Sequence, residues 1–270
     1  MTTIKTFLLV SLEQFRIDIR FKKRYFFSTL ITFITNLIVM AGVVLISMPA
    51  VAYGEEIESV LQLSNAGKLI GFIYFFLGMV SLGLAQSQVE GWRQVGVIDN
   101  IALSPLGVSG VICTRFLPNY LSTLISTFIS AGILSLIFKF PIEWHIGILV
   151  LNSLIASFGM FGLGLILGGL TIRFKQVGML SNLLFILLFA LGVMPIDYDM
   201  TGTFSPLARL FPFTQGLIRT RHALIPGFED TINVPMFLFL VCSFALFLVG
   251  LFVFRAFEKD SIKRGTLGAY

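Results

Sequence analysis

The sequence predicts an all-α membrane protein with six membrane-spanning helices, and two observations support this prediction. The chain has 270 residues, of which 56% are hydrophobic and 12% are charged, and its mean hydropathy is +0.94. Soluble domains carry about 25% charged residues, so the composition excludes an ordinary soluble fold. Six apolar stretches are also close to the roughly 20 residues that a helix needs to cross a bilayer. They are residues 26–51, 68–85, 108–138, 145–170, 178–195 and 234–254.

The distribution of basic residues predicts the orientation. With the N-terminus inside, 14 of the 19 Lys and Arg residues fall in cytoplasmic segments and five in outer segments. Positive charge concentrates on the cytoplasmic side of membrane proteins, so we expect both termini in the cytoplasm and the protein in the cell membrane. Topology thereby accounts for the net charge of +5, and we expect a lipid bilayer and no nucleic acid as partner.

We expect a single membrane domain over residues 1–270, because no long soluble insertion or low-complexity tract interrupts it. Within residues 1–24, Leu8, Leu12, Phe15 and Ile19 recur at helical spacing, which predicts an amphipathic helix in the inner interface. We expect residues 25–257 to form the six-helix bundle and residues 258–270 to form a cytoplasmic tail.

The segment 196–233, before the last span, contains apolar stretches that Pro206, Pro212 and Pro226 interrupt. Helix breaks at membrane depth are tolerated where protein buries them. We therefore expect a half-inserted, re-entrant helical hairpin at the outer leaflet.

Three smaller features have structural interpretations. Gly164 and Gly168 form a GxxxG pair, which favours close helix packing within the bundle or across a dimer. Cys113 and Cys242 fall inside predicted spans and are expected to be unpaired, packed thiols. Residues 53–67 are expected to form a solvated outer loop, and a calcium site is the alternative for its three glutamates, Glu55, Glu56 and Glu58.

Several residue patterns that particular functions require are missing from the sequence, and their absence argues against those functions. The predicted spans hold almost no ionisable residue away from their ends, which argues against proton coupling. No nucleophile–base pair or metal-ligand spacing is visible, and Gly67-Lys68 lacks the rest of a nucleotide-binding Walker A motif. We therefore expect a chain without an enzyme active site, in which any ATP-driven transport depends on another subunit.

One segment indicates the kind of transporter. Residues 96–106 read Gly-Val-Ile-Asp-Asn-Ile-Ala-Leu-Ser-Pro-Leu and join the second and third stretches. They resemble the first cytoplasmic loop of ABC-2-type transporter permeases (type V ATP-binding-cassette exporters). That loop reads close to glycine-threonine-leucine-glutamate, then glutamine, hydrophobic residues and serine or threonine before proline. Residues 211–219, from Phe-Pro-Phe-Thr to Arg, also resemble the family's asparagine-proline-hydrophobic-threonine stretch that ends in arginine. Here Phe211 replaces the asparagine, and the family's acidic residues just before the glycine are missing, with Glu90 further upstream.

The resemblance implies a coupling helix that contacts a separate ATPase subunit. Asp99 is then expected to accept hydrogen bonds from that subunit. Ile98, Ile101 and Ala102 are expected to fill an apolar groove, and Ser104-Pro105 to stop the helix. The implied coupling residues are Glu90, Arg93, Gly96, Ile98, Asp99, Ile101, Ser104 and Pro105, and those of the outer hairpin are Pro212, Thr214 and Arg219.

The family's function follows as an expectation from the same resemblance. The chain is expected to be the permease subunit of an exporter, with two ATPase copies that hold the ATP and Mg and a second permease, identical or related. The expected cargo is hydrophobic or amphipathic: a drug, a peptide or a lipid-linked glycan. Two alternatives stay open: an ion-gradient-driven transporter or channel without an ATPase, and a non-transporting membrane scaffold or immunity partner.

Overall fold

The computed structural model describes residues 2–46, 55–174, 177–193, 211–226 and 235–265, and this part of the chain is helical without strands. The all-α prediction is confirmed for these residues. The helices are α1 (Thr2–Arg24), α2 (Phe26–Ile46), α3 (Glu55–Gln94), α4 (Ile98–Ala102), α5 (Gly107–Phe138), α6 (Ile146–Phe174), α7 (Gly178–Val193), α9 (Pro212–Leu224) and α10 (Met236–Lys263).

Among the described residues, five helices are long and apolar enough to cross a membrane: α2, α3 from Gln62 onward, α5, α6 and α10. The chain therefore has the character of a multi-pass membrane protein. The sixth predicted span, residues 178–195, corresponds to α7, which has only 16 residues. Such a helix is about 24 Å long, which is less than the roughly 30 Å of a hydrocarbon core.

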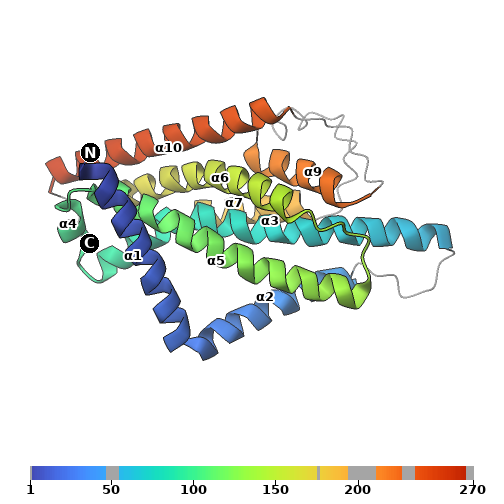
Figure 1. Ribbon diagram of the computed structural model, residues 1–270. Helices are drawn as coiled ribbons and strands as arrows, with labels where there is room; N and C mark the ends of the chain where they lie inside the picture. Colours follow the sequence, from blue (N-terminus) through green and yellow to red (C-terminus); the bar gives the residue numbers. More distant parts are fainter. Residues whose placement is uncertain (1, 47–54, 175–176, 194–210, 227–234, 266–270) are drawn as a thin grey trace.

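The long helices lie side by side, and the two ends of their bundle differ (Figure 1). The start of α1, the short helix α4 and the end of α10 lie together at one end, called the α4 end below. Helix α9 lies at the opposite end, called the α9 end. Helix α1 crosses α5 obliquely, and α3 extends furthest beyond its neighbours at the α9 end.

Helix α6 is the centre of the bundle because its glycines let two neighbours approach closely. A Cβ atom on Gly164 would lie 2.5 Å from the carbonyl oxygen of Leu82 in α3. On the other side of α6, a Cβ on Gly162 would overlap the backbone of α10 at Leu246, and one on Gly250 of α10 would overlap the carbonyl of Gly162. The predicted GxxxG pair therefore packs α6 against α3 within the chain.

One predicted loop is wrong. Helix α3 begins at Glu55, so residues 55–67 of the expected outer loop are helical. This stretch contains no proline and is rich in residues that favour helices, so its polar composition does not make it a loop. Helix α10 continues to Lys263, so the first residues of the segment expected to form the cytoplasmic tail are helical.

Candidate functional site

The predicted coupling segment is a tight connector at the α4 end, and two glycines shape it. Gly96 follows α3 with φ +74°, and Gly107 begins α5 with φ +65°. The N–H of Gly96 donates to the carbonyl of Arg93 at 2.9 Å, and that of Val97 donates to the carbonyl of Trp92 at 2.9 Å. This pair of bonds is a Schellman motif, which requires a left-handed residue at position 96. Gly96 thus reverses the chain into α4.

Three of the exposed residues of the connector are spaced four apart in the sequence. Val95 is 75% exposed and Leu103 is 86% exposed, with the exposed carboxylate of Asp99 between them. Ile98, in contrast, is fully buried, and Ile101 is half-buried against the chain's own core. The expectation that Ile98 fills a partner's groove is therefore wrong for this structure, because the bundle already covers it.

Arg93 is buried and fixes the end of α6. Its guanidinium donates to the carbonyls of Thr171 and Ile172 at 2.7 and 2.5 Å. The last carbonyls of a helix lack partners within the helix and carry partial negative charge, so a cation there is stabilising. Arg93 therefore positions the connector relative to α6.

Glu90 is a second member of the predicted set that acts within the bundle. Its carboxylate accepts a hydrogen bond from Gln86 at 2.8 Å, and Gln86 accepts one from the Ser181 hydroxyl of α7. Glu90 thus supports the contact between α3 and α7.

At the other end of the connector, the carbonyl of Ser104 accepts a hydrogen bond from the N–H of Gly107 at 3.0 Å, and Pro105 is exposed where the chain turns into α5.

A buried carboxylate that the sequence did not indicate closes this arrangement. Glu258 of α10 accepts hydrogen bonds from the backbone N–H groups of Val108 at 2.7 Å and Ser109 at 3.4 Å. Leu106, the N-cap residue of α5, has no side-chain cap bond, so Glu258 supplies the acceptor and the negative charge favoured at a helix N-terminus. The feature of the sequence that could have indicated this role is the position of Glu258, an acidic residue just after a long apolar stretch.

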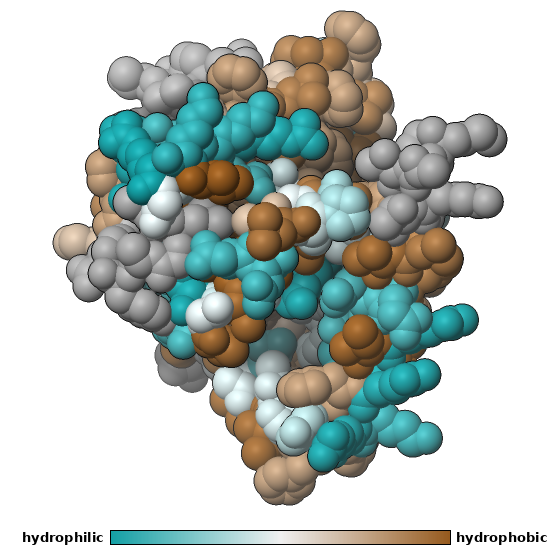
Figure 2. All heavy atoms as spheres, turned by 90° about the vertical axis from the view of Figure 1, so that its left-hand side faces the viewer, coloured by the Kyte–Doolittle hydropathy of each residue, from teal (hydrophilic) through white to brown (hydrophobic). Residues whose placement is uncertain are grey.

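The α4 end therefore presents the connector on a charged framework. Arg93 holds the C-terminus of α6, Glu258 holds the N-terminus of α5, and α4 lies between α3 and α5 in the chain. Figure 2 looks onto this end and shows hydrophobic side chains standing among hydrophilic ones. A mixed surface of this kind does not match the hydrocarbon of a bilayer, where charged side chains are costly.

At the opposite end, α9 is a short helix packed against α3, α6, α7 and α10. Pro212 occupies its first turn and is buried against Gly159 of α6. Thr214 is buried as well, and Arg219 is half-buried. The first arm of the expected hairpin, up to residue 210, lies outside the described residues.

Polar side chains join α9 to the bundle. The hydroxyl of Thr220 is 2.6 Å from the Tyr74 hydroxyl of α3 and accepts a hydrogen bond from Asn152 of α6 at 3.3 Å. Arg221 is buried and donates to the carbonyls of Gly67 at 3.0 Å and Gly192 at 2.8 Å. These contacts join segments that are far apart in the chain, and no pattern in the sequence predicts them.

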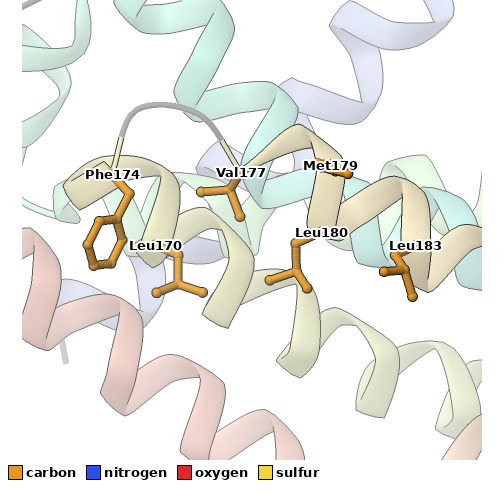
Figure 3. A pocket seen from close by; sticks show the side chains of 6 residues that line it. All are labelled: Leu170, Phe174, Val177, Met179, Leu180 and Leu183. Atoms are coloured by element: carbon orange, nitrogen blue, oxygen red, sulfur yellow. The ribbon is translucent and has the colours of Figure 1, made fainter.

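An apolar groove of about 570 Å³ lies where α6 ends and α7 begins. The side chains that line it come from both helices (Figure 3). None of the described side chains that line it is polar, so these side chains offer no group that could orient a polar ligand. The lining residues are Leu170, Phe174, Val177, Met179, Leu180 and Leu183.

The alternative calcium site lies outside the part of the chain whose side chains are described, since it depends on Glu55, Glu56 and Glu58. Elsewhere in the described residues, no group of three or more metal-ligating side chains occurs. Cys113 and Cys242 are both free thiols and are half-buried.

Comparison with known proteins leaves the family open. No protein-family model matches the sequence, and no curated protein matches it.

Proposed function

We propose that this chain is the membrane-spanning permease subunit of an ATP-binding-cassette exporter, and that the α4 end is cytoplasmic. The observation that carries the proposal is the connector geometry. The connector that contains the five-residue helix α4 exposes Val95, Asp99 and Leu103, while Arg93 joins α3 to α6 and Glu258 joins α10 to α5 on either side of it. A surface that must transmit force from a separate ATPase needs this kind of fixed attachment.

The topology supports six crossings. Five helices alone would leave the two ends of the chain on opposite sides, yet the start of α1 and the end of α10 lie at the same end of the bundle (Figure 1). Helix α7 therefore completes an even number of crossings as a sixth, short span. In this proposal α9 is the second arm of a re-entrant outer hairpin, and α1 lies along the inner interface.

The remaining parts of the proposal follow from the resemblance to ABC-2-type permeases. Two ATPase subunits hold ATP and Mg, and a second permease completes the transporter, either an identical copy or a related chain. The cargo is a hydrophobic or amphipathic molecule, in keeping with the predominantly apolar character of the helices. An ion-gradient-driven transporter is the second candidate, and flux by the purified chain alone would establish it.

The test is purification of the tagged chain from its native membrane, followed by identification of co-purifying proteins. An Asp99→Ala/Leu103→Ala double variant should lose an ATPase subunit that the wild type retains, because both substitutions lie on the exposed face of the connector. The matched control is Lys259→Ala/Ile262→Ala, which removes one exposed charge and one exposed apolar side chain from α10 near the same end. Retention of the ATPase by the connector variant, or absence of any ATPase from the wild type, contradicts the proposal.

A further inference from the structure

Lys68 of α3 is a buried cation that the proposed coupling mechanism does not use. Its side chain is 6% exposed, and within the described residues its ammonium makes one hydrogen bond, to Asn65 Oδ1 at 3.1 Å. The ion pairs among those residues involve other cations. An ammonium group has three donors, and a charge removed from water is costly unless further acceptors or an opposite charge meet it.

The position of Lys68 along α3 indicates its level in a bilayer. Lys68 precedes Glu90 on the same helix by 22 residues, which corresponds to about 33 Å along the axis. A hydrocarbon core is roughly 30 Å thick, so a helix whose Glu90 lies at one interface places Lys68 at the level of the opposite headgroups. A lysine at that level normally extends into water, and such a lysine would be exposed. The burial of Lys68 therefore needs another explanation.

The surroundings of Lys68 are rigid. One turn further into the bundle, Phe72 contacts Phe189 of α7 with ring centroids 6.2 Å apart. The adjacent backbones of Gly71 and Gly192 approach so closely that a Cβ on Gly71 would overlap the Gly192 carbonyl. Lys68 thus lies level with the end of α7, on a part of α3 that these contacts pack closely against α7.

We infer that Lys68 is an anion-binding group that takes a phosphate of an amphipathic molecule at the α9 end. The ammonium has donors beyond the one used by Asn65, and as a compact point charge it suits a phosphate oxygen without needing two parallel bonds. The phosphate can come from a phospholipid of the leaflet or from a phosphate-bearing cargo. Both sources share this chemistry, and the inference holds for the isolated chain whether or not an ATPase binds the α4 end.

The experiment measures the thermal stability of the delipidated, detergent-purified full chain with three additions at constant ionic strength. These are dioleoyl-phosphatidylglycerol, uncharged dioleoylglycerol and inorganic phosphate. Phosphatidylglycerol should raise the melting temperature of the wild type, and dioleoylglycerol should not. Protection by inorganic phosphate as well indicates that the site takes a free anion, and protection by phosphatidylglycerol alone indicates a lipid headgroup. A wild type that neither phosphate compound stabilises overturns the inference.

Variants assign the effect to Lys68. Lys68→Gln should weaken the apparent affinity for phosphatidylglycerol about tenfold, and Lys68→Arg should retain most of it because the charge stays. The matched control is Lys139→Gln, which removes an exposed lysine beyond the end of α5 and should leave the affinity unchanged. Equal affinities of the wild type and Lys68→Gln overturn the inference. If Lys68→Gln does not fold, native mass spectrometry of the wild type decides: it must retain phosphatidylglycerol in preference to dioleoylglycerol, and equal retention contradicts the site.

Discussion

The two ends of the bundle both use a buried arginine to hold backbone carbonyls, but they differ in what surrounds it. At the α4 end, Arg93 holds the last turn of α6, and Glu258 holds the first turn of α5 with the opposite charge. At the α9 end, Arg221 joins α3 to the end of α7, and its neighbour Thr220 is held by neutral hydroxyl and amide groups.

The difference indicates that each end has its own way of fixing helix ends. The α4 end attaches four helices, α3 to α6 and α10 to α5, through charged groups around a short, exposed connector. The α9 end combines the charged Arg221 with close backbone contact and a neutral hydrogen-bond network, and Lys68 is an additional buried cation. Substitutions can therefore test backbone packing at the α9 end, the buried carboxylate at the α4 end, and the arginine at each end.

The largest effect is expected from Gly71→Ala at the α9 end. The added methyl overlaps the carbonyl of Gly192, so α3 and α7 must separate, at a cost of about 3 kcal/mol. Gly42→Ala in α2 is the control, because no atom lies within 4 Å of the position of its Cβ, and it should be neutral or slightly stabilising. Melting temperatures in one detergent compare the two, and equal values contradict the backbone contact.

The next effect tests which face of the connector belongs to the bundle. Ile98→Ala removes a fully buried side chain and should cost about 3 kcal/mol of stability. Leu103→Ala changes a mostly exposed side chain and should alter stability by less than about 0.5 kcal/mol, while it weakens recovery of the ATPase. The opposite ranking in a thermal-shift measurement shows that Ile98, as the sequence predicted, faces the partner.

The third prediction compares the two arginines directly. Arg93→Met and Arg221→Met each leave two carbonyls without their charged donor, and each should cost about 2 kcal/mol. Hydrogen exchange separates the two variants: Arg93→Met should increase exchange at residues 95–106 and Arg221→Met at the end of α7. An increase at both ends in either variant contradicts independent attachment.

The sequence was sufficient for the long helices because bilayer-length apolar runs are a local property. It also located the connector, since Gly96 is required by a backbone conformation. The partners of Arg93 and Glu258 could not be predicted, because they lie 78 or more residues away in the chain and are brought close only by packing. The start of α3 was missed because a polar helix and a polar loop have similar compositions.

The smallest effect, and the sharpest test of the charged framework, is expected from Glu258→Gln. Glutamine retains one acceptor oxygen, but its amide group meets an N–H of α5 and the negative charge is lost, so stability should fall by about 1 kcal/mol. Asp260→Asn is the control, because Asp260 pairs with Arg173 and Arg264 near the surface. Asp260→Asn should lower the stability by less than about 0.5 kcal/mol, and this difference should disappear at high salt, which screens exposed ion pairs. Since Glu258 is buried, its effect should persist in 1 M salt, at which the Debye length is about 3 Å. An effect of Glu258→Gln that salt abolishes would show that helix ends at the α4 end are held by surface charge rather than by a buried cap.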